Sequence, residues 1–342
     1  MKNKKVILLV GIVLFCNFLM AVYLIFGRSS QVPENEKVTE VKALSIQENR
    51  RVSAKYRALL QTSDPTVAIR AYEEATKKQP LLLDSCHAVL HELGRDSYAK
   101  YANYAEAMRF RTDFCTSGYI HGVTEAYIQD AGDINEAIQI ACINEVPGGP
   151  FRWQCNHGIG HGLMFLSNNN LPYAIEKCQN NLNVQDRHSC INGVFMENFN
   201  SDQETHPSIY LKDDDPLFPC NEQKPEYMAE CYYTAPHFIL KKVKNNYRKA
   251  LDVCYRVEGK NRLECISGVI GIAMLKNLSS TNFVESLCTR EGAEQKACIN
   301  GILGGYISHY GSLDKAEVLC KSFKPNNEQL CYLYLSENSK LL

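Results

Sequence analysis

From residue 64 onward, the chain alternates between two kinds of segment that are each typical of an α-helix. The first kind opens on polar residues and ends at a cysteine, as in GDINEAIQIAC and NLPYAIEKC. The second kind begins at a cysteine and is rich in apolar and small residues, as in CNHGIGHGLMFL, CISGVIGIAML and CINGILGGYIS. A loop of roughly ten polar residues separates the two segments of each pair. The pattern predicts helical hairpins with little or no sheet.

Residues that favour helix starts support this interpretation of the first segments. Asp133 and Glu136 stand three positions apart, as in a capping box. Pro172 lies near the first turn of its segment, where proline is well tolerated, and Ser312 precedes the last segment of this kind. Each first helix is therefore expected to begin at a polar cap and to end near its cysteine.

The spacing of the cysteines gives the period of these hairpins. From Cys142 onward the cysteines form close pairs, and the first members of successive pairs are 36, 42, 34, 34 and 32 residues apart. A period near 34 residues is the signature of a two-helix repeat. Two earlier units, at residues 64–98 and 103–128, follow the same pattern with one cysteine each. We therefore expect an all-α fold, an αα-hairpin repeat solenoid of about eight hairpins, with one more helix at 47–61.

Disulfide bonds are expected to staple the two helices of each hairpin. The obvious bond joins the end of the first helix to the start of the second, and closing so short a loop is worth roughly 3 kcal/mol. Cys86 and Cys115 are then left to bond each other. The expected pairs are Cys86–Cys115, Cys142–Cys155, Cys178–Cys190, Cys220–Cys231, Cys254–Cys265, Cys288–Cys298 and Cys320–Cys331.

A long apolar run near the N-terminus predicts a membrane anchor. It extends from Val6 to Phe26, and a helix of that length rises about 31 Å, enough to cross the hydrocarbon core of a bilayer. Three lysines precede it, which favours a cytoplasmic N-terminus. A long signal peptide is the alternative, although the run lacks a small-residue cleavage site. We expect a cytoplasmic segment at 1–5, a transmembrane helix at 6–26, a linker at 27–46 and an extracytoplasmic helical domain at 47–342.

Cysteine content and charge agree with export. The chain has 15 cysteines, and setting aside Cys16 of the apolar run leaves 15 − 1 = 14. An even number suits a disulfide framework in an oxidising compartment, such as the periplasm or the cell surface. The net charge of −1 gives no sign of a nucleic-acid partner. The partners that we expect are the lipid bilayer, through residues 6–26, and a protein or peptide.

The period, the helix pairing and the placement of small residues resemble the Sel1-like and tetratricopeptide group of αα-repeat proteins, in particular the disulfide-stapled kind found outside the cytoplasm. The resemblance covers about residues 64–338. The tetratricopeptide consensus itself is not followed, and the cysteine positions are this chain's own. The resemblance implies a superhelix whose concave face, lined by one helix of each pair, binds other proteins. It does not imply catalysis.

Seven of the second helices have a small residue at the third position after the cysteine that opens the segment, with a shift of one residue in the first unit. These residues are Ala88, Gly118, Gly158, Gly193, Thr234, Gly268 and Gly301. Glycine costs a helix about 1 kcal/mol relative to alanine, so its recurrence requires a steric reason. The column predicts close crossings between neighbouring second helices.

The sixth position after the cysteine carries histidine in several units, with the same shift of one residue in the first unit. Its occupants are His91, His121, His161, Met196, His237, Gly271 and Gly304. His87 and His157 each precede a histidine of this column by four residues, so each pair lies on one face of its helix. Five of the chain's nine histidines thus lie on three successive second helices.

This column is the candidate metal site. The predicted ligands are His87, His91, His121, His157 and His161. Neutral imidazoles with a carboxylate suit Zn²⁺, Fe²⁺, Mn²⁺ or Cu²⁺, and disulfide formation removes the thiolates. Glu92, Glu125 and Glu197 are candidates for a ligand or a general base. The zincin motif and the CxxCH haem motif are absent.

Two interpretations of the histidines remain open on the sequence alone. A histidine that hydrogen-bonds a neighbouring backbone would be copied with its helix when a repeat duplicates, and would then have no ligand. The fold-level function that we expect is a membrane-anchored binding scaffold with a histidine-centred metal site. The alternative is a metal-dependent enzyme, a hydrolase or oxidoreductase, that uses the histidine and glutamate cluster.

Overall fold

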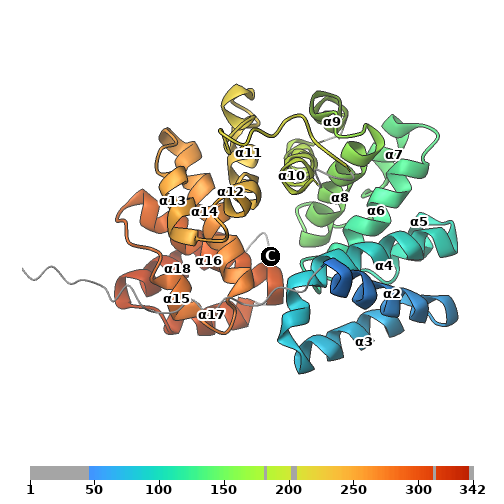
Figure 1. The fold of residues 1–342 in the computed structure, drawn as a ribbon, viewed down its shortest axis with the longest axis horizontal. Coiled ribbons are helices and arrows are strands. Elements are labelled where there is room, and N and C mark those ends of the chain that lie inside the picture. Colours follow the sequence, from blue (N-terminus) through green and yellow to red (C-terminus); the bar gives the residue numbers. More distant parts are fainter. Residues whose placement is uncertain (1–45, 181–182, 202–205, 311–312, 339–342) are drawn as a thin grey trace, which may run out of the picture. The chain divides into compact units, whose positions relative to one another are not determined.

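The protein is built from α-helices joined by short loops in the computed structural model, which describes residues 46–180, 183–201, 206–310 and 313–338 (Figure 1). Within these ranges no strand occurs, so the predicted all-α class is confirmed. The chain enters through α2 (Ile46–Thr62), the additional helix that the sequence predicts.

The second helices of the hairpins are mostly long. They are α4 (Cys86–Tyr101), α6 (Gly118–Asp130), α8 (Pro150–Leu166), α10 (Val184–Asn200), α11 (Met228–Thr234) with α12 (Pro236–Lys242), α14 (Gly259–Lys276), α16 (Ala293–Tyr310) and α18 (Pro325–Asn338). The first helices are mostly shorter. They are α3 (Pro65–Lys78), α5 (Tyr104–Met108), α7 (Ile134–Ile140), α9 (Leu171–Cys178), α13 (Tyr247–Cys254), α15 (Thr281–Glu285) and α17 (Leu313–Lys321). Two 3-10 turns, Pro80–Ser85 and Cys220–Glu222, complete the described elements.

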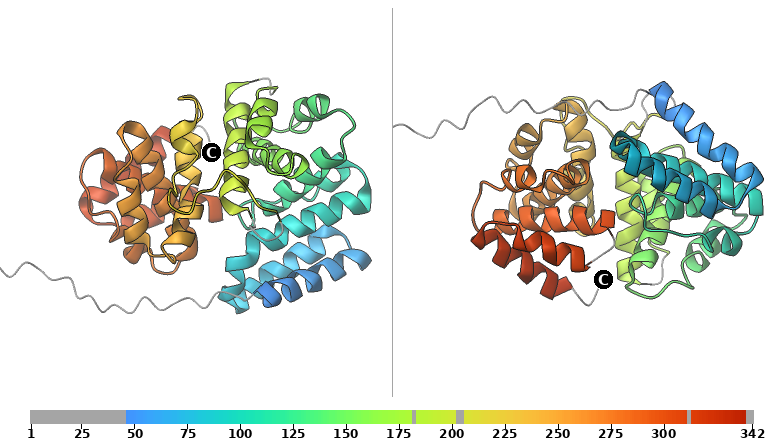
Figure 2. Two further views of the ribbon diagram at one scale, coloured as in Figure 1. Left: turned by 45° about the horizontal axis from the view of Figure 1, so that its top comes forward. Right: turned by 90° about the horizontal axis from the view of Figure 1, so that it is seen from below.

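Consecutive second helices pack against one another in chain order. Contacts join α4 to α6, α6 to α8, α8 to α10, α10 to α11, α11 to α14, α14 to α16 and α16 to α18. The green helices α6, α8 and α10 lie side by side in Figures 1 and 2. All of these helices belong to one compact unit. A side chain on one second helix therefore meets side chains from the helices of the units before and after it.

All seven expected disulfide bonds are present, including the Cys86–Cys115 bond that was assigned by elimination. Six of them join the first part of a hairpin to its second helix. In the bond between Cys220 and Cys231, the first part is the 3-10 turn Cys220–Glu222. The bond between Cys86 and Cys115 instead connects the start of α4 to the residues just before α6. It therefore ties one second helix to the next.

The second helices begin earlier than the sequence pattern predicts. Cys155 is the sixth residue of α8, and Cys190 is the seventh residue of α10. The polar residues before each cysteine, for which the sequence predicts a loop, form the first turns of these helices. At the start of α10, the Asn183 side chain accepts a hydrogen bond of 2.8 Å from the Asp186 backbone N–H and caps the helix. Pro236 divides the fifth second helix into α11 and α12, because proline has no N–H to continue a helix.

Glycines bring the second helices close together, as the small-residue column predicts. A Cβ atom added to Gly118 would lie 2.5 Å from the carbonyl oxygen of His87, and one added to Gly158 would lie 3.1 Å from the Cα atom of His121. A Cβ atom on Gly193 would collide with the carbonyl of His157. Alanine therefore does not fit at Gly118 or Gly193 unless the helices move apart, and the close crossings at the glycines of the column are confirmed.

Among the residues that the structure describes, no helix is long and apolar enough to span a bilayer. The predicted anchor at 6–26, its flanking segment 1–5 and the linker up to residue 45 lie outside the described residues.

Candidate metal centre

Five imidazole rings from three adjacent helices form one cluster, called the histidine cluster below. His87 and His91 lie on α4, His121 lies on α6, and His157 and His161 lie on α8. The centroids of neighbouring rings are 4.8 to 5.5 Å apart. The prediction that these histidines face a shared space is therefore confirmed.

The glycines of the neighbouring helices position these rings. Gly118 and Gly122 of α6 lie against the backbone carbonyls of His87 and His91 on α4. Gly158 of α8 lies in the same way against the backbone of His121. Because each glycine leaves room for the backbone that carries a histidine, the imidazoles of adjacent helices come into ring contact.

Two groups of three nitrogens within the cluster have the spacing of a metal site. One is formed by His87, His91 and His121, and the other by His121, His157 and His161. In each group the three nitrogens lie within 4.8 Å of one another. Nitrogens bonded to a tetrahedral Zn²⁺ are about 3.3 Å apart, since each bond is about 2.0–2.1 Å long. Ring rotations that move each nitrogen by less than about 1 Å therefore suffice to bind an ion. His121 belongs to both groups.

Two carboxylates contact the Nδ1 atoms of histidines in the cluster. Nδ1 of His161 donates to Oε2 of Glu197 at 2.6 Å, and Nδ1 of His91 lies 3.1 Å from Oε2 of Glu125. Glu125 is fully buried, and Arg95 donates to both of its oxygens at 2.9 and 3.0 Å. Carboxylates that bond the far nitrogen of a metal-binding histidine fix its tautomer and raise its basicity. Glu125 and Glu197, which the sequence offered as ligands or bases, thus contact histidines directly.

Glu92, the third carboxylate candidate, lies differently. Its side chain accepts a hydrogen bond of 2.6 Å from Arg95 and lies 3.6 Å from Arg57. Arg57 in turn is paired with Asp96 at 2.8 Å. Glu92 therefore belongs to a network of ion pairs beside the cluster, and it makes no hydrogen bond or ion pair with a histidine among the described residues.

The hydrogen bonds leave one lone pair of each oriented ring available. Nδ1 of His87 donates to the carbonyl oxygen of Cys115 at 3.0 Å, which leaves the lone pair on Nε2. His91 and His161 present Nε2 for the same reason. Nε2 of His121 donates to Oε1 of Gln154 at 2.7 Å, which leaves the lone pair on Nδ1.

Three of the ring nitrogens are buried without a hydrogen-bond partner. They are Nδ1 of His121, Nδ1 of His157 and Nε2 of His161. The three residues that carry these atoms form one of the two groups, and all three are buried. Buried polar atoms are normally paired, and one left alone costs about 1–3 kcal/mol. The three atoms therefore point to a species that accepts their lone pairs.

Burial keeps the rings neutral. It lowers the pKa of His87 to about 4, with a smaller contribution from the charge of His161. Burial also lowers the pKa of His91, His121 and His157 well below the usual 6.5, and the neighbouring imidazoles lower it further. At neutral pH these rings carry lone pairs, the form in which histidine binds a metal ion.

Several residues around the cluster were not assigned to it from the sequence. Sδ of Met196 lies 3.1 Å from Nε2 of His157, and the Trp153 ring stacks on His157 with centroids 5.1 Å apart. Met196 occupies the sixth-position column, so its alignment with His91, His121 and His161 was the available signal. Gln154 and Trp153 precede the cysteine, where the repeat gave no comparable signal.

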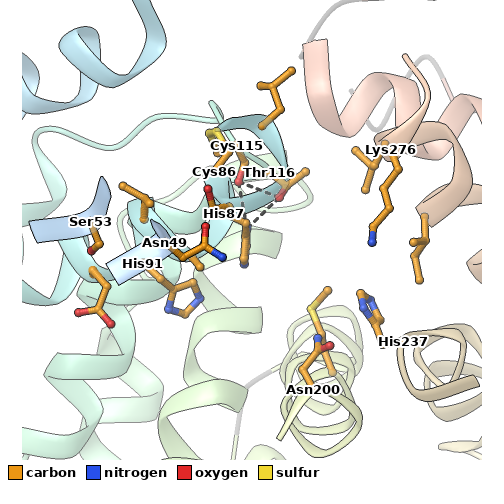
Figure 3. Close-up of a pocket in the computed structure, with 18 of the residues that line it drawn as sticks. Asn49, Ser53, Cys86, His87, His91, Cys115, Thr116, Asn200, His237 and Lys276 are labelled. Carbon is orange, nitrogen blue, oxygen red and sulfur yellow. Dashed lines mark hydrogen bonds between the residues drawn. A yellow bond between two sulfur atoms is a disulfide. The ribbon is translucent and has the colours of Figure 1, made fainter. Parts of the chain in front are cut away.

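A pocket of about 1000 Å³ opens onto the histidine cluster. His87 and His91 line one side of it, and His237 and Lys276 line the other (Figure 3). His161 also belongs to the lining. His237 was in the same sixth-position column, and the break at Pro236 begins the helix that carries it. The cluster is therefore accessible to a small molecule from the pocket.

Comparison with family models, with curated proteins and with solved structures found no match to this chain. The structure is compatible with a helical repeat protein, and the resemblance to the Sel1-like group stays a prediction. Interpretation of the site rests on its own residues.

Proposed function

We propose that this protein is an exported metalloprotein that binds a transition-metal ion in the histidine cluster. The observation that carries the proposal is the set of three buried nitrogens without a partner on His121, His157 and His161. One ion would accept all three lone pairs at once. A single buried water has two hydrogens to donate and would leave at least one nitrogen alone.

The surrounding atoms support this chemistry. The lowered pKa values of His87, His91, His121 and His157 keep these four rings neutral at neutral pH. The carboxylates of Glu125 and Glu197 contact rings of the cluster, and every cysteine among the described residues is in a disulfide. Imidazole nitrogens suit Zn²⁺, Cu²⁺ and Fe²⁺, and a thioether such as Met196 suits copper. Mn²⁺ fits less well, since it prefers oxygen ligands.

The pocket favours a second candidate function, metal-dependent catalysis. A catalytic ion keeps a coordination position open to substrate, whereas a structural ion is closed off. His87, His91 and His161 line the pocket, so an ion that they bind would face it. Glu92 also lines the pocket and is the carboxylate best placed to act as a general base there.

The cellular setting belongs to the proposal as well. Seven disulfide bonds support an oxidising compartment, and the apolar run 6–26 supports a membrane anchor. The order in which the second helices pack supports an αα-repeat solenoid. A protein or peptide partner on a concave face of that solenoid remains part of the proposal.

Metal analysis of the full-length protein tests the proposal. The oxidised protein is stripped of metal, titrated with Zn²⁺ or Cu²⁺, dialysed and analysed for bound metal. Trp153 is the only tryptophan and stacks on His157, so Cu²⁺ bound in the cluster should quench its fluorescence. We expect about one equivalent or more of metal in the wild type, with quenching that saturates at the same ratio.

Two substitutions show whether the metal occupies the cluster. His121→Ala removes the residue shared by both groups and should abolish stoichiometric binding. His188→Ala should leave binding intact, because His188 is paired with Glu230 outside the cluster and its side chain is 43% exposed. Circular dichroism establishes that the variants fold, and His161→Gln replaces His121→Ala if the latter does not. A wild type that retains no metal after reconstitution would refute the proposal.

A further inference from the structure

The pocket beside the histidine cluster has an excess of positive charge, although the whole chain has a net charge of −1. Among the residues that line it, the permanently charged side chains are Arg50, Arg57, Arg95, Lys241, Lys276 and Glu92. Five of them are cations and one is a carboxylate. Like charges gathered at one cavity raise the local concentration of ligands of the opposite charge.

The cations on the two sides of the pocket differ in whether they are paired with carboxylates. On the α2 and α4 side, Arg57 and Arg95 are held by carboxylates, since Arg57 pairs with Asp96 and Arg95 pairs with Glu92 and Glu125. Their charges are largely balanced within the protein. The excess therefore lies at Arg50 of α2 and at the opposite wall, where α12 and α14 carry Lys241 and Lys276 and no carboxylate lines the pocket.

Lys276 is the main feature of that wall. It lies at the end of α14, its side chain points into the pocket near His237, and no carboxylate lies within ion-pair distance of it among the described residues (Figure 3). Lys241 of α12 lines the same wall, and its Nζ atom donates to the neutral carbonyl oxygen of Phe199 at 3.2 Å. The charge of Lys276 is thus available to a ligand in the pocket. This wall is called the lysine wall below.

The pKa of His237 is affected by the lysines of the lysine wall. Burial, with smaller contributions from the charges of Lys241 and Lys276, lowers the pKa of His237 to about 3. The two lysine charges are therefore felt at His237, where they disfavour a further cation.

Apolar side chains line both sides of the pocket, among polar ones. They are Leu83 and Val89 on the side of α4, Leu240, Ile272 and Leu275 on the side of α12 and α14, and Met196 of α10. A bare inorganic ion would leave these side chains facing water. A ligand with an apolar body would cover them and gain about 25 cal/mol for each Å² of apolar surface that it buries.

We propose that the pocket binds an organic anion, with its acidic group at Lys276 and Lys241 and its apolar body extending toward His87, His91 and His161. The acidic group is a carboxylate or a phosphate, both of which lysine binds as a point charge. This ligand site extends the proposed metal site but does not require it, because its residues are at the opposite wall. If the cluster holds a metal, the anion is the substrate or exogenous ligand presented to it.

Calorimetric titration of metal-free, full-length protein tests the proposal. The probes share one aromatic body and differ in the polar group: 1-naphthoate, 1-naphthyl phosphate and the neutral 1-naphthamide. Titrations into the same detergent without protein provide the blank. We expect saturable binding of at least one anion, about tenfold or more tighter than binding of the amide. The stronger of the two anions then identifies the acidic group.

Substitutions locate the binding. Lys276→Met should weaken the preferred anion by about tenfold and leave the amide unchanged, while Lys276→Arg should restore most of the affinity. Lys249→Met is the matched control, because Lys249 is an exposed lysine of α13 outside the pocket lining. Equal binding of anion and amide, or equal effects of the Lys276 and Lys249 substitutions to methionine, would overturn the proposal. Because no metal is present in this experiment, its result is separate from the outcome of the metal analysis.

Discussion

Glu197 accepts a hydrogen bond of 2.6 Å from Nδ1 of His161, while Nε2 of the same ring is buried and has no partner. The carboxylate therefore fixes the ring so that its lone pair points into the histidine cluster. The pair consisting of His188 and Glu230 has the same separation of 2.6 Å, but the His188 side chain is 43% exposed and lies outside the cluster. The two pairs allow a matched comparison.

Glu197→Gln should weaken metal binding by about 10–100-fold, because a carboxylate behind a ligating histidine raises its basicity. The amide retains the shape of the side chain and removes its charge. Glu230→Gln should leave the affinity unchanged. The measurement is a competition titration against a chelator of known affinity. Equal affinities in the two variants would show that Glu197 has no role in metal binding.

Arg95→Ala should destabilise the fold by about 2–3 kcal/mol, since it leaves the carboxylate of Glu125 buried without its charged partner. The estimate is below the range for fully buried pairs because the Arg95 side chain is 30% exposed. The control is Arg109→Ala, whose partner Glu106 lies on the surface with a side chain 50% exposed. It should change stability by less than about 0.5 kcal/mol. Denaturant unfolding of the oxidised, metal-free protein measures both values.

Stability of the metal-free protein should fall as the pH drops from about 6.5 toward 4. In the folded state burial lowers the pKa of His87 to about 4, whereas in the unfolded chain it is about 6.5. The unfolded chain therefore binds the proton first, and this contribution to stability, complete above pH 6.5, is lost as the pH falls. His87 alone accounts for about 2 kcal/mol between pH 6.5 and 5.

The pH effect is measured by denaturant unfolding at pH 7 and pH 5. His87→Gln should reduce the difference between the two values, because glutamine does not titrate. A wild-type stability that is the same at both pH values would show that His87 is not buried as a neutral ring.

Gly193→Ala should destabilise the protein by about 1–3 kcal/mol, because the added methyl group collides with the backbone carbonyl of His157. Gly304→Ala provides the opposite case on α16, since nothing lies within 4 Å of the position of its Cβ. There alanine should stabilise the helix by up to about 1 kcal/mol. Thermal unfolding of the two variants should thus shift in opposite directions. A stable Gly193→Ala variant would contradict the role of glycine in bringing α8 and α10 together.

The repeat made much of this site predictable from sequence. Aligning the cysteines, with a shift of one residue in the first unit, placed His91, His121 and His161 at one position of neighbouring helices. The spacing of four residues then added His87 and His157. The parity of the cysteines gave the bond between Cys86 and Cys115, which no local pattern would have indicated.

Other parts depend on contacts between segments that the repeat does not describe. Gln154 bonds a partner on the preceding unit and Arg95 one on the next unit, and such pairs follow from the exact rotation of each helix. The early starts of α8 and α10 were missed, because polar first turns and polar loops have the same composition. The charge excess at Lys276 emerges only when α14 is folded across from α4.

The bond between Cys86 and Cys115 has a consequence for the order of events during maturation. It holds the carbonyl of Cys115 at His87, so oxidation fixes the orientation of that ring. Free thiols in the unoxidised chain would compete with the imidazoles for a soft metal. Under the proposed function, oxidation therefore precedes metal loading, and a chain supplied with metal too early would bind it at the wrong residues.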